Sequence, residues 1–303
     1  MYKLPLTVEP SVIINLMLGI IFAFLAYFSW AIGDFFGAVA SRKAGGLTTS
    51  FWVMVIIAIL GALYVPFSYT QLQNLTFTTF WILLTLIILG PIPLVAFNEG
   101  LRVGNASLVG TIGGSFAAVV VILSILFLKE PITIPQILSI TVIFLGIFLS
   151  SFDLKLLNNK KLITDPGIPY ALIALIGWGI YFTFIKIPVS EIGWFWPPYL
   201  SQFGFISIYL YSKLKGVSVF GPKLKASLPQ IMLSSIIGNT GFFSYNYAIS
   251  IAPVAIVAPI AGSYPTLFVF LAFLIFRDKI TKQQILGILT TLAGIVLLSF
   301  LSI

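Results

Sequence analysis

Long runs of apolar residues alternate with short polar segments along the whole chain. A helix that crosses a bilayer core needs about 20 apolar residues, and ten runs come close to that length. Strands of a membrane barrel would be about 10 residues long with alternating polarity, whereas these runs are longer and apolar on every side. The pattern predicts an all-α polytopic membrane protein with ten transmembrane helices. The predicted spans are Ile13–Ala40, Ser50–Tyr69, Thr79–Phe97, Ser107–Leu128, Pro135–Phe152, Ile168–Pro188, Phe195–Tyr211, Leu228–Ile249, Val254–Phe276 and Gln283–Leu301.

The first run is too long for the core of a signal peptide, so we expect the protein to retain it.

The composition agrees with a membrane protein and excludes a soluble one. Of the 303 residues, 59% are hydrophobic and only 8% are charged, against about 25% charged residues in soluble domains. The chain has no His and no Cys, which excludes disulfides, thiolate metal sites and His-based catalytic triads. Its net charge of +8 is scattered in short clusters between apolar runs. We therefore expect the lipid bilayer as a partner and no nucleic acid.

The chain contains an internal repeat. A shift of 148 residues aligns the two halves without a gap, and Phe97–Phe152 is identical to Tyr245–Phe300 at 19 of 56 positions. Polar residues fall in register, which shared apolar composition does not explain. We therefore predict two repeats of five helices each, over residues 1–154 and 155–303. Because five is an odd number, the second repeat enters the membrane from the opposite side, an inverted-repeat arrangement typical of transporters with a site between the repeats.

Basic residues in the loops predict the orientation. Cytoplasmic loops of membrane proteins carry an excess of Lys and Arg. Lys3, Lys129 and Lys186 lie on the side of the two termini, and the remaining 13 of the 16 basic residues lie on the other side. We predict a cell (plasma or inner) membrane location with both termini outside and the loop Asp153–Asp165 inside.

Three segments carry recognisable motifs. They are Phe28–Gly45 in the first span, Glu99–Val109 with Leu128–Pro131 and Gln136–Gly146, and the copy Tyr247–Val257 with Phe276–Lys279 and Gln284–Gly294. As an ordered and duplicated set they resemble the EamA branch of the drug/metabolite transporter superfamily. The resemblance implies a ten-helix carrier of small metabolites, with a central cavity lined by the first, third, fourth, sixth, eighth and ninth helices. Members are often described with cytoplasmic termini, so the charge count departs from the family's usual orientation.

Asp34 is an acid at membrane depth, where ionisable groups are costly and usually face a bundle interior or an aqueous cavity. It lies one helical turn from Trp30, on the same face. It is therefore either an anchor for a cationic or amine-bearing substrate, a proton site, or an interfacial acid paired with Arg42 or Lys43. Its repeat mate is Phe182, so this acid breaks the symmetry between the repeats.

Trp30 and Trp178 are repeat mates in the first helix of each half. Together with Tyr181 and Phe182 they would form an aromatic cage or gate that stacks on a planar or cationic substrate. Helix packing and the interfacial aromatic belt are the alternatives. The depth of both residues within their spans argues against the belt.

Asn98 and Asn246 form a second matched pair of polar residues within the spans. Amides in hydrocarbon need partners, so each would bind substrate or another helix. Ser115 and Ser263 follow matched glycines, of which Gly114 belongs to a Gly110-xxx-Gly114 packing motif.

We also expect Tyr264 to border the cavity and Pro259 and Pro265 to break the ninth helix.

The other charged residues are expected to be structural. Glu99 would pair with Arg102 at the interface, and Lys129–Glu130 and Arg277–Asp278 would anchor loops by hydrogen bonds. Lys186 would extend toward water, with its stem along apolar surface.

The sequence indicates a secondary active transporter, because no Gly-Lys-Ser/Thr nucleotide-binding loop is present. It would move a small organic metabolite or drug-like solute by alternating access, need no metal or cofactor, and act as a monomer or weak homo-oligomer. A non-transporting scaffold or sensor and an intramembrane enzyme are the alternatives, and the enzyme lacks an evident catalytic constellation. The predicted substrate-binding residues are Trp30, Asp34, Asn98, Ser115, Trp178, Tyr181, Asn246, Ser263 and Tyr264.

Overall fold

A computed structural model describes residues 10–151, 165–221, 223–276 and 281–302. Almost all of these residues are helical, and this described part of the chain contains no strand. The helices of the first half are α1 (Pro10–Ala44), α2 (Gly46–Gly61), α3 (Val65–Ser68), α4 (Phe77–Leu89), α5 (Pro91–Val103), α6 (Ala106–Gly114), α7 (Phe116–Leu123) and α8 (Ile134–Ser151). The helices of the second half are α10 (Ile168–Phe184), α11 (Lys186–Ile192), α12 (Trp196–Ser201), α13 (Phe205–Leu214), α14 (Lys223–Ile251), α15 (Val254–Ala261), α16 (Pro265–Phe276) and α17 (Lys282–Ser302).

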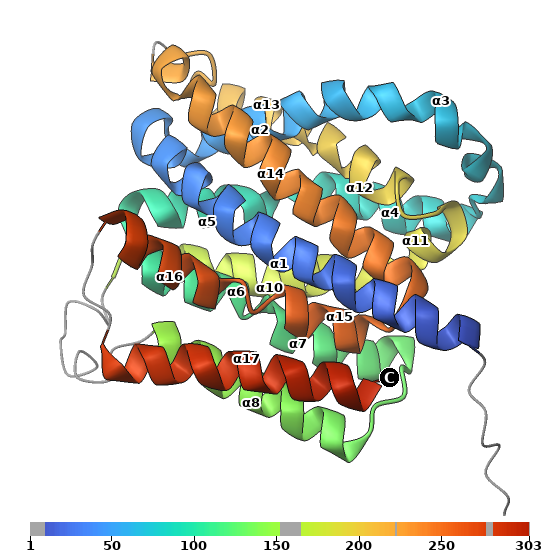
Figure 1. The fold of residues 1–303 in the computed structure, drawn as a ribbon. Coiled ribbons are helices and arrows are strands. Elements are labelled where there is room, and N and C mark those ends of the chain that lie inside the picture. The colour runs from blue at the N-terminus through green and yellow to red at the C-terminus, as the bar shows by residue number, and fades with distance from the viewer. Residues whose placement is uncertain (1–9, 152–164, 222, 277–280, 303) are drawn as a thin grey trace, which may run out of the picture.

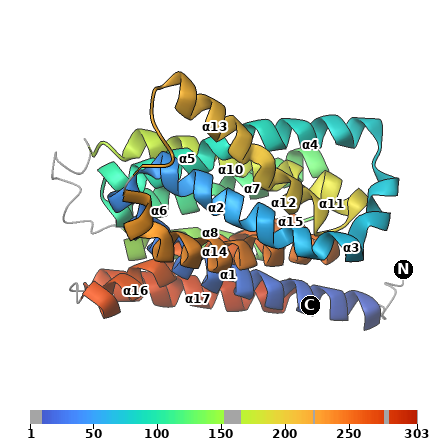
Figure 2. The same cartoon turned by 90° about the horizontal axis from the view of Figure 1, so that it is seen from above.

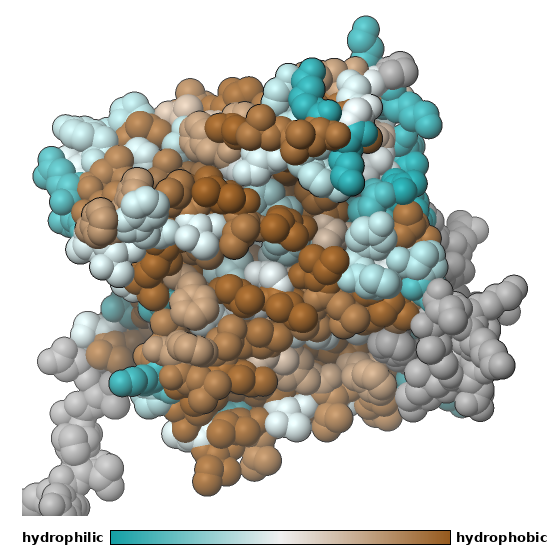
Figure 3. All heavy atoms as spheres, turned by 180° about the vertical axis from the view of Figure 1, so that it is seen from behind, coloured by the Kyte–Doolittle hydropathy of each residue, from teal (hydrophilic) through white to brown (hydrophobic). Residues whose placement is uncertain are grey.

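Several helices are long and apolar enough to cross a membrane. Within the described residues there are six such spans, and two shorter apolar helices accompany them. The six spans are Pro10–Ala44, Gly46–Asn74, Phe77–Val103, Leu108–Leu128, Ile168–Ile192 and Lys282–Ser302. Large apolar side chains such as Ile59 (66% exposed) and Val296 (65% exposed) lie on the outer surface, and apolar residues cover the middle of the face seen in Figure 3. The chain is therefore a multi-pass membrane protein.

The helices run side by side between two ends of the molecule (Figure 1). The start of α1 and the end of α17 lie at one end, whereas the α1–α2 turn and the α13–α14 connection lie at the other (Figure 2). The start of α1 and the end of α17 thus lie at the opposite end of the molecule from these two connections, which carry basic residues.

The packing of the helices follows the internal repeat. The first helix of the chain, α1, packs most extensively on α14, and α10, its repeat mate, packs on α5. Because α5 and part of α14 are repeat mates in turn, each half inserts its first helix against the third helix of the other half. The fifth helices of the two halves, α8 and α17, pack on each other. The repeat is therefore present in tertiary contacts as well as in the sequence.

Close contacts between helices occur at matched glycines. A Cβ atom on Gly33 of α1 would lie 2.6 Å from the Cα atom of Gly238 in α14, and a Cβ atom on Gly90 would lie 3.0 Å from the Tyr181 ring of α10. Gly90 and Gly238 are repeat mates, and so are Gly33 and Tyr181. The α1–α14 crossing therefore requires glycine at position 33, whereas a Cβ atom on Gly238 would make an ordinary contact of 3.8 Å with Gly33 Cα. The matching crossing of α10 has the Tyr181 ring in place of Gly33.

Both Gly-Ser segments interrupt their helices. Ser115 separates α6 from α7, and residues 262–264 separate α15 from α16. Pro265 begins α16, as expected for a residue that cannot continue the preceding helix. Pro259, by contrast, lies inside α15 without breaking it. The predicted break is thus confirmed at Pro265 and wrong at Pro259.

The predicted Gly110-xxx-Gly114 packing motif is only half correct. A Cβ atom on Gly114 would lie 2.3 Å from the Cγ atom of Pro265, so this glycine permits a close contact. A Cβ atom on Gly110 would meet no atom within 4 Å. Gly110 therefore faces space rather than a neighbouring helix.

Candidate functional site

A cavity lies where the two halves of the chain meet. It is formed by the six predicted helices and also by α2 and the segment Ser201–Gln202, which belong to the second helix of each half. Eight helical segments from both halves converge on this space, which makes it the candidate site.

The cavity lining repeats with the chain. Fourteen of its eighteen residues form seven pairs related by the shift of 148 residues. The pairs are Trp30 with Trp178, Asp34 with Phe182, Val53 with Ser201, Met54 with Gln202, Gly90 with Gly238, Leu94 with Phe242, and Phe116 with Tyr264. The remaining lining residues are Asn98, Tyr181, Ser234 and Asn239. Each half therefore contributes mostly equivalent positions to the cavity.

The chemistry of these pairs is unequal. Asp34 faces the cavity opposite its mate Phe182, and the polar Ser201 and Gln202 have the apolar mates Val53 and Met54. A symmetric backbone arrangement thus carries an asymmetric set of polar groups. The two sides of the cavity that the repeats supply therefore differ in polarity.

Asp34 lies in α1 beside the cavity, and the hydroxyl of Tyr264 is its hydrogen-bonding neighbour. No salt bridge joins Asp34 to a Lys or Arg in the described part of the chain. The Arg42 side chain instead donates to the carbonyl oxygen of Leu101 at 3.4 Å, and Lys43 is exposed. The alternative of an interfacial ion pair is therefore wrong, because α1 carries Asp34 about two turns deeper than these bases.

Trp30 is the centre of a group of aromatic rings. Its ring centroid lies 5.3 Å from that of Phe182, 5.8 Å from Phe116, 5.5 Å from Tyr245 and 5.9 Å from Tyr264. These distances are within the 4.5–7 Å range of favourable aromatic pairs.

Trp178 joins the same group through Phe116, at 5.9 Å. The Tyr181 hydroxyl donates to Ser201 Oγ at 2.6 Å. Both tryptophans and Tyr181 line the cavity, as an aromatic cage would require.

Asn98 borders the cavity and also connects three helices. Its Oδ1 accepts a hydrogen bond from Ser41 of α1 at 3.0 Å, and its Nδ2 donates to Ser50 of α2 at 3.0 Å and to the carbonyl of Leu94 at 3.2 Å. Of the two predicted roles for this amide, the interhelical one is present in the structure.

Three predicted site residues lie outside the cavity lining. Ser115 donates to the carbonyl of Thr111 and Ser263 to that of Ile260, so each hydroxyl is bonded to its own helix. Asn246 is fully buried, and its amide donates to Phe242. At both helix breaks the next residue, Phe116 or Tyr264, lines the cavity in place of the serine.

Four polar lining residues were not predicted: Ser201, Gln202, Ser234 and Asn239. Gln202 and Asn239 are amides in the middle of predicted spans, which is a sequence signal that could have identified them. Their amide nitrogens donate to Pro198 and Ser235 of their own helices.

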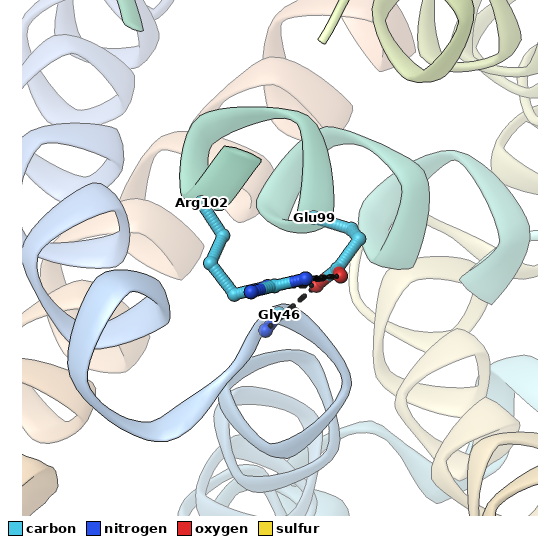
Figure 4. Close-up of polar contacts among 3 residues, drawn as sticks. All are labelled: Gly46, Glu99 and Arg102. Atoms are coloured by element: carbon cyan, nitrogen blue, oxygen red, sulfur yellow. Dashed lines mark hydrogen bonds and ion pairs between the residues drawn. The ribbon is translucent and has the colours of Figure 1, made fainter. Parts of the chain in front are cut away.

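Two further carboxylates, Glu99 and Glu130, connect neighbouring helices. Glu99 pairs with Arg102, as predicted, and its carboxylate also accepts from the backbone of Gly46 at 3.2 Å (Figure 4). The Glu130 carboxylate accepts from the backbone amides of Val254 and Ala255 at 2.9 and 2.8 Å. The predicted loop hydrogen bond of Glu130 is thus confirmed at the first turn of α15.

Lys186 differs from expectation. Its ammonium donates to the carbonyls of Ile249 and Ala252 at the end of α14 rather than extending toward water. Arg277–Asp278, which is the repeat mate of Lys129–Glu130, lies outside the described residues. No cluster of carboxylates that could hold a metal ion occurs among the residues that the structure describes.

One solved structure, described as a crystal structure of a protein, has a similar fold. The alignment has a TM-score of 0.70 and 12% identity, and it covers 94% of this chain and 97% of that chain. No curated protein matches the sequence.

A model of the EamA-like transporter family matches residues 17–152 and again residues 165–300. The starts of the two matches differ by 148 residues (165 − 17 = 148), the shift that aligns the halves of the chain and pairs the lining of the cavity. Since the two matches together extend over most of its length, the chain belongs to the EamA-like transporter family.

Proposed function

We propose that this protein is a secondary active transporter that moves a small organic metabolite or drug-like solute by alternating access. The observation that carries the proposal is the cavity between the two halves, lined by repeat-related positions with unequal polar groups. Secondary transporters place their substrate sites at the interface between repeats, near the bilayer midplane. A scaffold or sensor would have no need of such a cavity.

The ten-pass topology is part of this proposal. The helices group into five passes per half, with α2 to Asn74, α4 with α5, and α6 to Leu128 each forming one pass of the first half. Five passes per half place the halves in opposite directions across the membrane. The reciprocal packing of α1 on α14 and of α10 on α5 supports this inverted arrangement.

Two aromatic clusters in repeat-related positions are suited to alternate closure. Phe51 of α2 lies 6.2 Å from Tyr209 of α13, measured between ring centroids. Tyr199, the repeat mate of Phe51, lies against Gly61, and Gly61 is the repeat mate of Tyr209. We infer that Phe51 with Tyr209 closes the cavity toward one side of the membrane. Tyr199, packed on Gly61, would close it toward the other side.

Substrate binding is assigned to the predicted residues that line the cavity. These are Trp30, Asp34, Asn98, Trp178, Tyr181 and Tyr264. Ser115, Asn246 and Ser263 are proposed to shape the helices around the site, since their hydrogen bonds run to their own backbone.

A metabolite-resolved uptake and efflux screen in proteoliposomes tests the transport function. The reference variant is Asn239→Trp, which places a large ring in the cavity, and its matched control is Leu233→Trp on the exposed face of the same helix. We expect at least one solute to cross with the native chain and with Leu233→Trp, at a rate at least 10-fold lower with Asn239→Trp. Equal rates for the two variants would contradict transport through this cavity.

A further inference from the structure

The central cavity has one formal charge and no opposing base. Asp34 is the only acid among its lining residues, and the described lining contains no Lys or Arg. A buried carboxylate without a basic partner is costly, so it binds a proton or a cation whenever one can reach it. The other titratable groups near Asp34 are tyrosines, of which Tyr264 is its direct neighbour. The cavity therefore favours a positively charged occupant over an anion.

The amides of the cavity add hydrogen-bond acceptors to this carboxylate. The nitrogen of Gln202 donates to Pro198 at 3.0 Å and the nitrogen of Asn239 donates to Ser235 at 2.9 Å. Within the described residues no donor contacts the carbonyl oxygen of either side chain. These two oxygens remain available as hydrogen-bond acceptors in the same cavity as the Asp34 carboxylate. An occupant with N–H groups matches this arrangement.

Aromatic rings surround the acceptors. Phe116 and Phe182 are stacked with centroids 4.8 Å apart, and Trp30 lies within 6 Å of both. Such faces stack on flat apolar groups and attract cations held within about 6 Å of a ring centroid. The rings thus fit a planar body attached to the charged group.

We propose that the transported solute is a monovalent ammonium ion with N–H donors on a planar apolar body, held by Asp34, Gln202 and Asn239 and stacked on Trp30. This inference rests on the proposed function, because it assigns the substrate class of the same cavity. A carboxylate on the solute would find no cationic partner among the described lining residues. Zwitterions and anions are therefore weaker ligands than the matching ammonium ion.

Binding to the full-length protein in lipid nanodiscs tests the charge requirement. Radiolabelled 2-(1-naphthyl)ethylammonium is the probe, and protein-free nanodiscs correct for partition into lipid. Unlabelled competitors of similar shape are the neutral naphthylethanol, the anion naphthylpropionate and the zwitterion naphthylalanine. We expect the ammonium ion to compete at concentrations at least 10-fold lower than each of the other three. Equal or stronger competition by the alcohol, the anion or the zwitterion would overturn the proposal.

Two variants locate the interaction. Asp34→Asn should lower affinity for the ammonium ion at least 10-fold, and Glu191→Gln, at a partly exposed acid of α11 outside the cavity lining, should leave it unchanged. Gln202→Leu should weaken binding of the ammonium ion severalfold but not of its N-trimethyl analogue, which has no N–H donors. If Asp34→Asn does not fold, Gln202→Leu alone tests the proposal. The ratio of its affinities for the ammonium ion and the N-trimethyl analogue is then compared with that of the native protein. An unchanged ratio refutes the role of the Gln202 oxygen as a hydrogen-bond acceptor for the solute.

The same probe separates this inference from the proposed function. Selective binding without movement of the ammonium ion into proteoliposomes would refute transport and retain the cation site. Transport of another solute with no selective binding of the ammonium ion would refute the substrate class and retain the transporter.

Discussion

At the scale of single residues, Asp34 distinguishes the two halves of the molecule. Its repeat mate is Phe182, and both side chains face one cavity. A carboxylate at this depth without a basic partner in the described chain is costly. That cost is compatible with a group that exchanges a proton for a positively charged solute during each transport cycle.

Replacing Asp34 with Asn should abolish transport driven by a pH gradient. The amide keeps the size of the side chain but cannot release a proton, so solute movement loses its coupling to protons. Accumulation of solute in proteoliposomes with an imposed pH gradient measures the effect, with Glu191→Gln as the control acid. Unchanged transport with an unchanged pH dependence would exclude Asp34 as the coupling residue.

The sequence indicates which face of a helix borders the site more reliably than how far along the helix the site extends. Asn239 and Asn246 are seven residues apart in α14, about two turns, and therefore share a face. Only Asn239 lines the cavity, because the open space ends near Phe242 and the packed rings beyond it exclude Asn246. Apolar periodicity contains no information on where such a space ends, so the prediction assigned Asn246 to the site and missed Asn239.

At the scale of elements, close helix crossings depend on particular glycines. The repeat alignment predicted that Gly90 and Gly238 are equivalent, and the structure places both at crossings with the first helix of the other half. It could not predict that Gly110 faces space, since a small-xxx-small motif specifies a surface but not the helix that meets it. Tertiary arrangement decides which of several such surfaces is used.

Replacing Gly33 with Ala should destabilise the protein. The new Cβ atom would lie 2.6 Å from Gly238 Cα and 2.8 Å from its backbone nitrogen, so α1 and α14 must separate. Overpacking of this kind costs about 1–3 kcal/mol. The midpoint of thermal unfolding in detergent should therefore fall.

The matched control is Gly110→Ala, which fills open space within a helix. Alanine is favoured over glycine in a helix by about 1 kcal/mol, so this variant should unfold at the same or a higher temperature. A lower midpoint for Gly110→Ala than for Gly33→Ala would contradict the assigned crossing.

At the scale of the whole molecule, the duplication explains both the fold and the location of the site. Repeat-related residues meet in one cavity because each half supplies the same positions. They include Phe116 with Tyr264, Trp30 with Trp178, and Gly90 with Gly238. The repeat and the six spans that the described residues contain were predictable from apolar runs and register alone. The second helix of each half was not expected in the lining. The amide of Gln202 was a polar signal in the second half, but Val53 and Met54 have none, and only packing turns them toward the cavity.

The distribution of basic residues across the two ends predicts how the molecule is oriented in the membrane. Lys215 lies in the α13–α14 connection, at the end opposite the start of α1 and the end of α17 (Figure 1). Exposed Gln73, near the start of α4, belongs to the side of the termini in the proposed topology. Since positive loops remain in the cytoplasm, we expect Lys215 inside and Gln73 outside.

Cysteine labelling in intact cells measures this orientation directly, because the chain contains no Cys of its own. A membrane-impermeant maleimide should label Gln73→Cys in intact cells and Lys215→Cys only after permeabilisation. Both residues are exposed, so a difference in labelling reports the side of the membrane rather than burial. Labelling of Lys215→Cys but not Gln73→Cys in intact cells would place the termini in the cytoplasm. The charge asymmetry between the two ends would then have a cause other than membrane insertion.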